Sequence, residues 1–411
     1  MHKKTAIAVL VNLAYFEIGL MVSVMGALIP DIIKAYKLDY SAAASLPVAY
    51  YLSFGVMAIP SGLLIEKWSY KKSLLTAYGT VLCGILCFIF FSDYTSRIGA
   101  IFLIGCALTL VQVLAFPLLR EVMGAENLPF HSTLNTFVYG VGAFASPYFY
   151  TLIIRWTEHS SSLLSWSKGT YPWVTIYYIF FAVFLITTVI IVGVKFPPVK
   201  LEASERIGNF ASFKELLSNK YLYFYFFALF SYAACEQGIS NWITQFLSSY
   251  HRVDSQTTGS YVLSGYWLLL SVGCLFGMIL LKYFTSIRIL LSFTIAAVIC
   301  FCCSVFGSRN ASVVFFPLTG LFHSIMWPLI LSLGMNSINR HHGSLSGLLF
   351  AASSGGAFGA MMVGKLGDAF GLRWGLLFLL ICYAVVGSVY FWSRKIRIHT
   401  TESEYVSVAN T

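Results

Sequence analysis

Charged residues are scarce in this chain of 411 residues: Asp, Glu, Lys and Arg make up 10% of it, whereas 58% of its residues are hydrophobic. Soluble domains carry about 25% charged residues, because their surface must be hydrated. The scarcity excludes an ordinary soluble domain and predicts that most of the surface faces membrane lipid. The net charge of +10 does not indicate a nucleic-acid partner, because the basic residues lie mostly between apolar segments, where they meet anionic headgroups.

Patterns typical of metal, cofactor or catalytic chemistry are also missing. Nearly all of the nine cysteines lie inside apolar runs, as Cys83, Cys87 and Cys106 do, without zinc or disulfide spacing. The phosphate-binding loop of ATP-driven engines is absent, and no nucleophile constellation is present. We therefore expect neither an enzyme nor a cofactor or metal. The N-terminus runs into a span too long for a signal peptide, which predicts a retained first helix.

Long apolar stretches predict twelve membrane-spanning helices, since about 20 apolar residues cross the hydrocarbon core. A polar stretch from Pro197 to Lys220 separates two sets of six, and its amphipathic pattern at Phe210, Phe213, Leu216 and Leu217 predicts a short interfacial helix. The expected fold is all-α, with six-helix bundles at 1–196 and 220–396, a linker at 197–219 and a tail at 397–411. The predicted spans are 6–33, 42–66, 71–92, 96–120, 130–155, 171–196, 220–248, 257–282, 286–307, 311–339, 342–370 and 373–395.

The distribution of Lys and Arg predicts the orientation. Most of the 26 basic residues fall on one side when both termini are placed on that side, and basic loops stay in the cytoplasm. We therefore expect a multi-pass protein of the plasma membrane, or of a bacterial inner membrane, with both termini cytoplasmic.

The two halves repeat short phrases. Gln112-x-x-x-Phe116-Pro117 in the fourth span returns as His323-x-x-x-Trp327-Pro328 in the tenth, and Gly142-Ala143-Phe144 returns as Gly356-Ala357-Phe358. Internal repeats in a membrane protein are typical of transporters whose halves rock around a site between them. The repeat therefore predicts a site between the bundles.

Several motifs point to one family. The loop after the second span reads Gly62-Leu-Leu-Ile-Glu66-Lys67-Trp-Ser-Tyr-Lys71-Lys72; the others are Leu28-Ile29-Pro30, Phe116-Pro117, Cys235-Glu236-x-Gly238-Ile-x-Asn241-Trp242 and Gly355-Gly356. The loop resembles a degenerate form of the loop motif of the major facilitator superfamily. The other motifs resemble its fucose permease and glucose/galactose transporter branch, the fucose:proton symporter family. The resemblance implies the major facilitator fold, a sugar or similar polyhydroxy solute, alternating access and a monomer.

The departures from that family concern proton coupling. In fucose permeases one carboxylate before the proline of span 1 and one before the proline of span 4 carry the coupling. Counted back from Pro30 and Pro117, these positions are Gly26 and Gln112 here, and neither side chain titrates. Coupling by that pair of carboxylates cannot be carried over.

Three other residues are candidates for proton coupling, because ionisable groups inside a bilayer are costly and usually functional. Glu236 in span 7 is the first. His323 in span 10 could titrate near neutral pH. Glu17 in span 1 is the third, but on a helix it points away from the small and polar face through Gly19, so it could instead face a neighbouring helix.

Candidate solute-binding residues lie near these groups. Gln237, Asn241 and Gln245 form a polar stripe on span 7, which must face a partner helix or a water-filled cavity. The alternative is hydrogen bonding and packing between helices. The complete set of predicted solute-binding residues is Gln112, Phe116, Asn135, Gln237, Asn241, Trp242, His323 and Trp327.

These features predict a secondary transporter that moves a small polar solute, a sugar by resemblance, with a proton or another cation as the candidate coupled ion. Alternatives on the same fold are an exporter or importer of a drug, siderophore or other metabolite, and a facilitated-diffusion uniporter, because a fold does not fix its substrate. A non-transporting sensor would be expected to carry an additional signalling domain. The expected partners are the solute, the coupled cation and membrane lipids.

Overall fold

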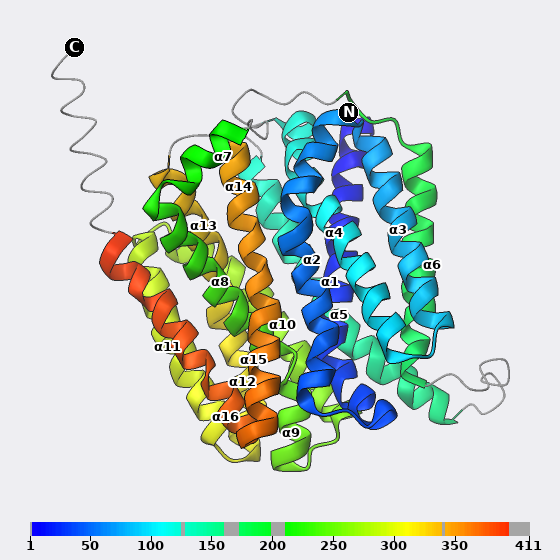
Figure 1. Cartoon of the computed structure of the whole chain (residues 1–411), viewed down its shortest axis with the longest axis vertical. Helices are drawn as coiled ribbons and strands as arrows, with labels where there is room; N and C mark the ends of the chain where they lie inside the picture. Colours follow the sequence, from blue (N-terminus) through cyan, green and yellow to red (C-terminus); the bar gives the residue numbers. More distant parts are fainter. Residues whose placement is uncertain (1, 125–127, 160–171, 199–209, 339–341, 394–411) are drawn as a thin grey trace.

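The computed structural model describes residues 2–124, 128–159, 172–198, 210–338 and 342–393, and within this part of the chain the regular structure is helical (Figure 1). The predicted all-α membrane fold is confirmed. The helices of the first half are α1 (His2–Tyr36), α2 (Tyr40–Lys67), α3 (Tyr70–Phe90), α4 (Tyr94–Met123), α5 (Leu128–His159), the turn η2 (Pro172–Val174) and α6 (Thr175–Gly193).

The second half begins after the short helix α7 (Phe210–Leu217), which confirms the helix predicted in the linker. Its elements are α8 (Lys220–Ser240), α9 (Ile243–His251), η3 (Ser255–Gly259), α10 (Ser260–Leu280), α11 (Ser286–Phe306), α12 (Arg309–His323), α13 (Met326–Ser337), α14 (His342–Ala351), η4 (Ala352–Ser354), α15 (Gly355–Phe370) and α16 (Leu372–Leu377). Helix α16 opens a last span that continues to Ser393.

The described residues contain eleven helices long and apolar enough to cross a membrane. The remaining predicted span, 220–248, corresponds to the pair α8 and α9, which a turn at Asn241 and Trp242 separates.

Side-chain caps set several helix boundaries near the predicted ones. Asp93, for example, accepts a hydrogen bond from the Ser96 amide at the start of α4 (2.8 Å), and hydrogen bonds from the side chain and backbone of Ser96 lower the pKa of this exposed carboxyl.

The helices form two groups that lie side by side (Figure 1). In the first, α1 packs on α5 and α4 packs on α2 and α3; in the second, α8 packs on α15 and α12 packs on α10 and α11. Helix α5 meets α10, and α2 meets α14 and α15, across the boundary between the groups. The predicted domain limits stay predictions, because 199–209 and 394–396 lie outside the described residues.

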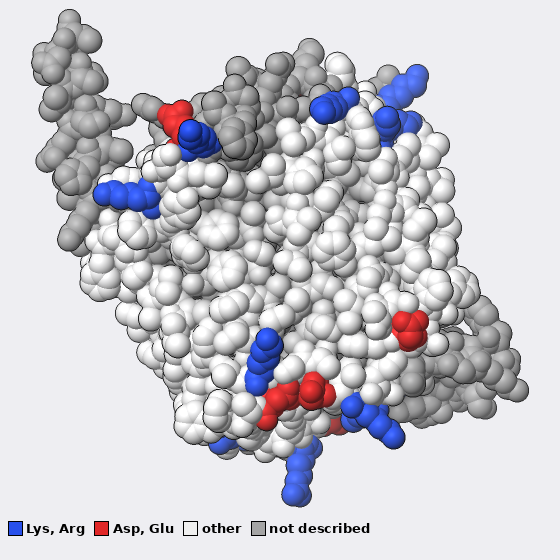
Figure 2. Space-filling model, in the orientation of Figure 1, with Lys and Arg blue, Asp and Glu red and all other residues white. Residues whose placement is uncertain are grey.

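The N-terminus and α7 lie at one end of the bundle, called the proximal end below; α9 and the start of α2 lie at the opposite, distal end (Figure 1). Figure 2 shows that charged side chains gather toward these two ends, with a broad uncharged band between them. Such a band is expected of a surface that contacts lipid hydrocarbon.

Four spans of the second half are interrupted, the last of them by a turn at Phe378 after α16. A turn at Asn241 and Trp242 separates α8 from α9, a turn at Ser324 and Ile325 separates α12 from α13, and η4 separates α14 from α15. In the first half, by contrast, Pro30 and Pro117 lie inside continuous helices. Breaks in spanning helices expose backbone groups, which are tolerated only where protein or a cavity can bind them.

Candidate functional site

The break in span 10 lies directly after His323 and is satisfied by side chains of neighbouring helices. Pro328 has no amide hydrogen, so the helix cannot close its usual hydrogen bond to Ser324. The carbonyl of Ser324 instead accepts from Cys274 Sγ of α10 (3.3 Å), and the carbonyl of His323 accepts from Tyr232 Oη of α8 (3.0 Å). Side chains of α8 and α10 therefore stabilise the break in span 10.

The His323 ring is fully buried between tyrosines. Its Nδ1 lies 2.6 Å from Tyr266 Oη on α10, and its Nε2 lies 2.6 Å from Tyr383 Oη on the last span. A neutral imidazole has one donor and one acceptor nitrogen, so it satisfies both contacts with one hydroxyl accepting and the other donating. His323 thus ties α12 to two neighbouring helices at the break.

Glu236 on α8 is partly exposed and contacts this cluster through Tyr232. Tyr232 Oη lies 3.0 Å from Glu236 Oε1 and 3.0 Å from the His323 carbonyl oxygen. The Tyr232 hydroxyl donates in this contact, and its one proton is shared between the carboxyl oxygen and the His323 carbonyl oxygen. Tyr232 therefore connects the Glu236 carboxyl to the break of span 10.

Gln237 connects Glu236 to the first bundle. Its Nε2 donates to Glu236 Oε2 (3.2 Å), and its Oε1 accepts from Tyr51 Oη of α2 (2.5 Å) and Ser240 Oγ (3.1 Å). The polar cluster consists of Tyr51, Tyr232, Glu236, Gln237, Tyr266, His323 and Tyr383. Tyr51 is its one member from the first half. The two halves are thus hydrogen-bonded to each other beside the carboxyl group.

A first polar contact near the distal end joins α1 and α5 to η3. The buried carboxylate of Asp31 accepts from Tyr150 Oη and from Gln256 Nε2 (2.8 Å). The backbone oxygen of Gln256 in turn accepts from Thr151 Oγ1 (2.7 Å). Gln256 is therefore held to the first half at both its side chain and its backbone.

A second contact near the distal end joins α15 to the start of α2. The Asp368 carboxylate accepts from the backbone amides of Tyr40 (2.7 Å) and Ser41 (2.8 Å) and from Ser41 Oγ. Asp368 thus caps a helix of the other half, where its charge also interacts favourably with the helix dipole.

A third contact depends on the small size of Gly26. Thr244 Oγ1 of α9 donates to the Gly26 carbonyl, and a Cβ at position 26 would collide with the Ser240 carbonyl oxygen and lie 3.2 Å from Asn241 Cα. The backbone of α1 therefore lies directly against the break between α8 and α9. This packing leaves no room for a side chain at position 26.

The predicted residues do not all join this cluster. Asn241 lies at the break, where its Nδ2 donates to the Gln237 carbonyl (2.8 Å) and its buried Oδ1 has no partner among the described residues. Asn135 is buried one turn before Tyr139, and its Oδ1 is likewise unpartnered there. The half-buried Trp327 ring lies 6.1 Å from the Tyr232 ring, beside the His323 group.

Gln112 of the first repeat and the aromatic Trp242 lie elsewhere. Gln112 is half-buried on α4, without a described bond to the cluster, and the Phe116 side chain lies outside the described residues. Trp242 is fully buried, and its indole N–H donates to the Ala360 carbonyl (3.1 Å) while its ring packs on Tyr40 (5.6 Å). These contacts favour packing at the distal end for Trp242.

Glu17 faces the interior of the first bundle, the alternative that the helical geometry left open. Its carboxyl group is fully buried and accepts from Tyr78 Oη of α3 (2.6 Å) and Thr187 Oγ1 of α6 (2.5 Å). Gly19, on the other side of α1, packs on α5. Glu17 is thus bound within one half and separated from the boundary between halves.

The prediction of one continuous polar stripe on span 7 is wrong beyond Asn241. The turn at Asn241 and Trp242 interrupts the helix, and Gln245 on α9 donates to Ser249 Oγ (3.0 Å) near the distal end. Sequence periodicity could not reveal the break, because it assumes one continuous helix.

Tyrosines are the members of the candidate site that the sequence did not indicate. Tyr232 precedes Glu236 by one helical turn, a spacing that could have indicated a contact. Tyr51, Tyr266 and Tyr383 carry no such signal, because the chain has 25 tyrosines and only the packing of the helices selects these three.

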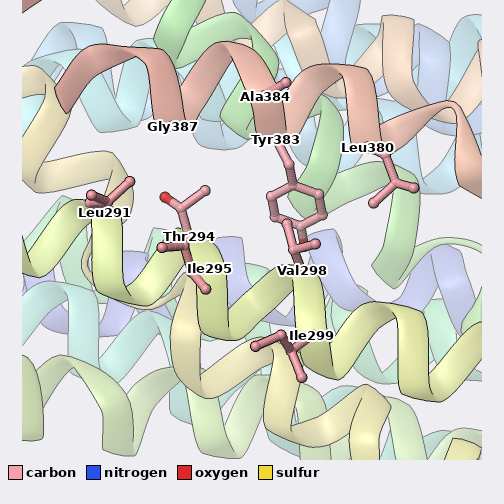
Figure 3. A pocket seen from close by; sticks show the side chains of 9 residues that line it. All are labelled: Leu291, Thr294, Ile295, Val298, Ile299, Leu380, Tyr383, Ala384 and Gly387. Atoms are coloured by element: carbon pink, nitrogen blue, oxygen red, sulfur yellow. The ribbon is translucent and has the colours of Figure 1, made fainter. Parts of the chain in front are cut away.

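A hollow of about 370 Å³ lies between α11 and the last span (Figure 3). Its lining is almost entirely aliphatic, and the Thr294 hydroxyl already donates a hydrogen bond to the Leu290 carbonyl (2.7 Å). The Tyr383 ring contributes to the lining, while its hydroxyl contacts His323. The hollow offers no free polar group to a polar solute and is not the candidate site.

Comparisons with known proteins agree with this architecture. The sequence profile of the Major Facilitator Superfamily matches residues 11–360. A glucose/galactose transporter of Brucella abortus is 24% identical over 386 residues, covering 91% of each chain, and the L-fucose-proton symporter of Escherichia coli is 23% identical over 385 residues, covering 87% of this chain and 86% of the relative.

Solved structures show the same fold. The Escherichia coli fucose:proton symporter gives a TM-score of 0.68 at 20% identity, covering 96% of this chain and 99% of that chain. A bacterial homologue of the human lysosomal transporter Spinster, in an inward-facing and occupied conformation, gives a TM-score of 0.78 at 12% identity, covering 96% of this chain and 98% of that chain.

Proposed function

Because this chain belongs to the major facilitator superfamily, whose members are secondary transporters, we propose that it carries a sugar across the membrane together with a proton. The observation that carries the proposal is the hydrogen-bonded chain Tyr51, Gln237, Glu236 and Tyr232, which joins the two halves beside a carboxyl group in the middle of the bundle. A site between two rocking halves is the arrangement that alternating access requires.

The side chains around the site favour a neutral polyhydroxy solute. Amide, hydroxyl and aromatic groups dominate, and no described Lys or Arg interacts with Glu236. The described basic residues lie near the ends of their helices or in loops. An anionic solute would meet a carboxyl group with no cation to balance its charge, which is unfavourable in a site of low dielectric. The names of the relatives, glucose/galactose transporter and L-fucose-proton symporter, support a sugar.

Uptake by the purified full chain in proteoliposomes tests this function. We expect labelled glucose, galactose or fucose to accumulate when a proton gradient is imposed, and we expect sugar phosphates and sugar acids not to compete. Without a gradient the same sugar should only equilibrate. A chain that equilibrates a sugar but ignores the gradient would be a uniporter; one that accepts none of these sugars, or prefers an anion, would contradict the sugar proposal and point to another solute.

The contacts near the distal end support a proposed conformation. With the termini cytoplasmic, as the basic residues predict, Asp31, Asp368 and Gly26 lie toward the outer face, and their contacts close the outer side of the site. We propose that this is the inward-facing state of a transporter working as a monomer, and that these contacts break when the outer side opens.

Replacing Asp368 by alanine should favour outer opening. Loss of a helix cap costs about 1 kcal/mol, which shifts a two-state equilibrium about fivefold. A cysteine at the buried Ser255 of η3 should then react about fivefold faster with a membrane-impermeant maleimide, after correction for the native cysteines. Unchanged labelling would show that the Asp368 contact does not contribute to the closed state.

A further inference from the structure

Tyr51 forms the described hydrogen bond between the two halves that lies nearest to Glu236. Its hydroxyl donates to Gln237 Oε1 at 2.5 Å, and both side chains are buried. Gly356 of α15 packs on the pair: a Cβ there would lie 2.9 Å from Gln237 Cγ and 2.9 Å from the Tyr51 ring. The absence of a side chain at position 356 thus lets Tyr51 and Gln237 meet.

The hydroxyl of Tyr51 determines which way the Gln237 amide points. Oε1 has two lone pairs, and it accepts from Tyr51 and from Ser240 Oγ (3.1 Å). The amide nitrogen must then face Glu236 Oε2, to which it donates at 3.2 Å. Without the Tyr51 proton, one of the two bonds that fix this orientation is lost, and the amide is free to rotate.

Tyr51 also stands at the end of the hydrogen-bonded chain. From Gln237 the chain continues through Glu236 and Tyr232 to the carbonyl of His323 at the break of span 10, and all of these residues belong to the second half. When the halves rock apart, the link that must break is therefore the one to Tyr51. Breaking it changes the groups around the Glu236 carboxyl.

We propose that Tyr51 is a positioning residue that couples the proton on Glu236 to the closure of the outer side. The proposal rests on the proposed function, in which Glu236 binds the coupled proton. With the outer side closed, Tyr51 holds the Gln237 N–H against Glu236 Oε2 while Tyr232 occupies Oε1. With the outer side open, the amide is released, and Glu236 exchanges its proton in a different environment.

The other titratable groups near Glu236 do not provide such a link. They are Tyr139 of α5, Tyr232 of α8, Tyr266 and Cys274 of α10, and His323 of α12. Tyr139 is the only one of these from the first half, and its described side-chain contact is an edge-on packing of its ring on Trp267 (6.0 Å). Tyr51 is the neighbour that joins the halves by a hydrogen bond.

The test compares Tyr51→Phe with Tyr50→Phe in proteoliposomes of the full chain. Tyr50 is the adjacent residue, is fully buried, and its hydroxyl has no hydrogen-bond partner among the described residues, so it is a matched control. We expect Tyr51→Phe to keep exchange of labelled for unlabelled sugar within about twofold, and to lose about tenfold in gradient-driven accumulation. Tyr50→Phe should keep both activities.

Gly356→Ala provides a second variant that keeps the hydroxyl but separates Tyr51 from Gln237, and it should show the same selective loss. Accumulation by Tyr51→Phe equal to that of Tyr50→Phe would overturn the inference, as would a parallel loss of exchange and accumulation in both Tyr51→Phe and Gly356→Ala. These outcomes leave the proposed function standing if Glu236→Gln is uncoupled. A wild-type chain that ignores the proton gradient would instead contradict the proposed function itself.

Discussion

Replacing Glu236 by glutamine is expected to abolish gradient-driven accumulation while sugar exchange continues. Glutamine has the shape of a protonated glutamic acid, and its amide oxygen can still accept from Tyr232, whose hydroxyl lies 3.0 Å from Glu236 Oε1. It cannot release a proton. Exchange needs no net proton movement, so the site should still bind and carry the solute.

The expected size of this effect follows from the gradient. One pH unit supplies about 1.36 kcal/mol per proton, which supports accumulation of up to about tenfold with one coupled proton. The Glu236→Gln variant should therefore fall from this ratio to about one. The measurement is the ratio of internal to external labelled sugar at steady state, with exchange measured on the same vesicles.

Glu17→Gln is the matched control, because Glu17 is a glutamate inside another span and is bound by Tyr78 and Thr187 within the first bundle. It should accumulate sugar as the wild type does. Accumulation lost in Glu17→Gln and kept in Glu236→Gln would move the coupling site to the first bundle. If both variants accumulate normally, His323 becomes the remaining candidate.

Replacing Gly26 by valine is expected to prevent closure of the outer side and to stop transport. Any Cβ at this position collides with the Ser240 carbonyl at the end of α8, and this backbone cannot move as a flexible side chain would. Overpacking costs about 1–3 kcal/mol, which shifts the equilibrium toward the outward-open state by between about fivefold and about a hundredfold.

The measurement for Gly26→Val combines uptake with labelling of a cysteine at Ser255, which should rise as uptake falls. Gly79→Val is the control, since no heavy atom lies within 4 Å of a Cβ at that glycine of α3. Normal uptake by Gly26→Val would show that the contact of α1 with the break of span 7 is not needed in the transport cycle. Reduced uptake by both variants would indicate a general cost of valine in a helix.

Alternation between two conformations explains why these two positions should have the largest effects. In the proposed cycle, Gly26 lies where the halves touch in one state and separate in the other, and Glu236 is the proposed proton site between them. Most other described residues move with their own bundle, so their contacts persist in both states. A substitution among them changes stability more than it changes the balance between states.

The location of the site was predictable in part. The doubled phrase around Gln112 and His323 led to the middle of spans 4 and 10, and His323 does lie at a helix break, where Tyr232 connects its carbonyl to Glu236. The two copies differ in structure, however: Pro117 lies inside the continuous helix α4, whereas Pro328 follows the break between α12 and α13. A repeated sequence therefore did not imply a repeated local geometry.

The sequence by itself determined the membrane fold, because the length and hydrophobicity of each span follow from local composition and the thickness of the bilayer. It also determined that positions 26 and 112 carry Gly and Gln, which cannot exchange a proton. Only the tertiary structure decided that Glu17 faces Tyr78 inside one bundle, that Tyr51 reaches Gln237 across the two halves, and that Gly26 touches the break of span 7. Such contacts join residues far apart in the chain, and the packing of whole helices selects them from many chemically equivalent side chains.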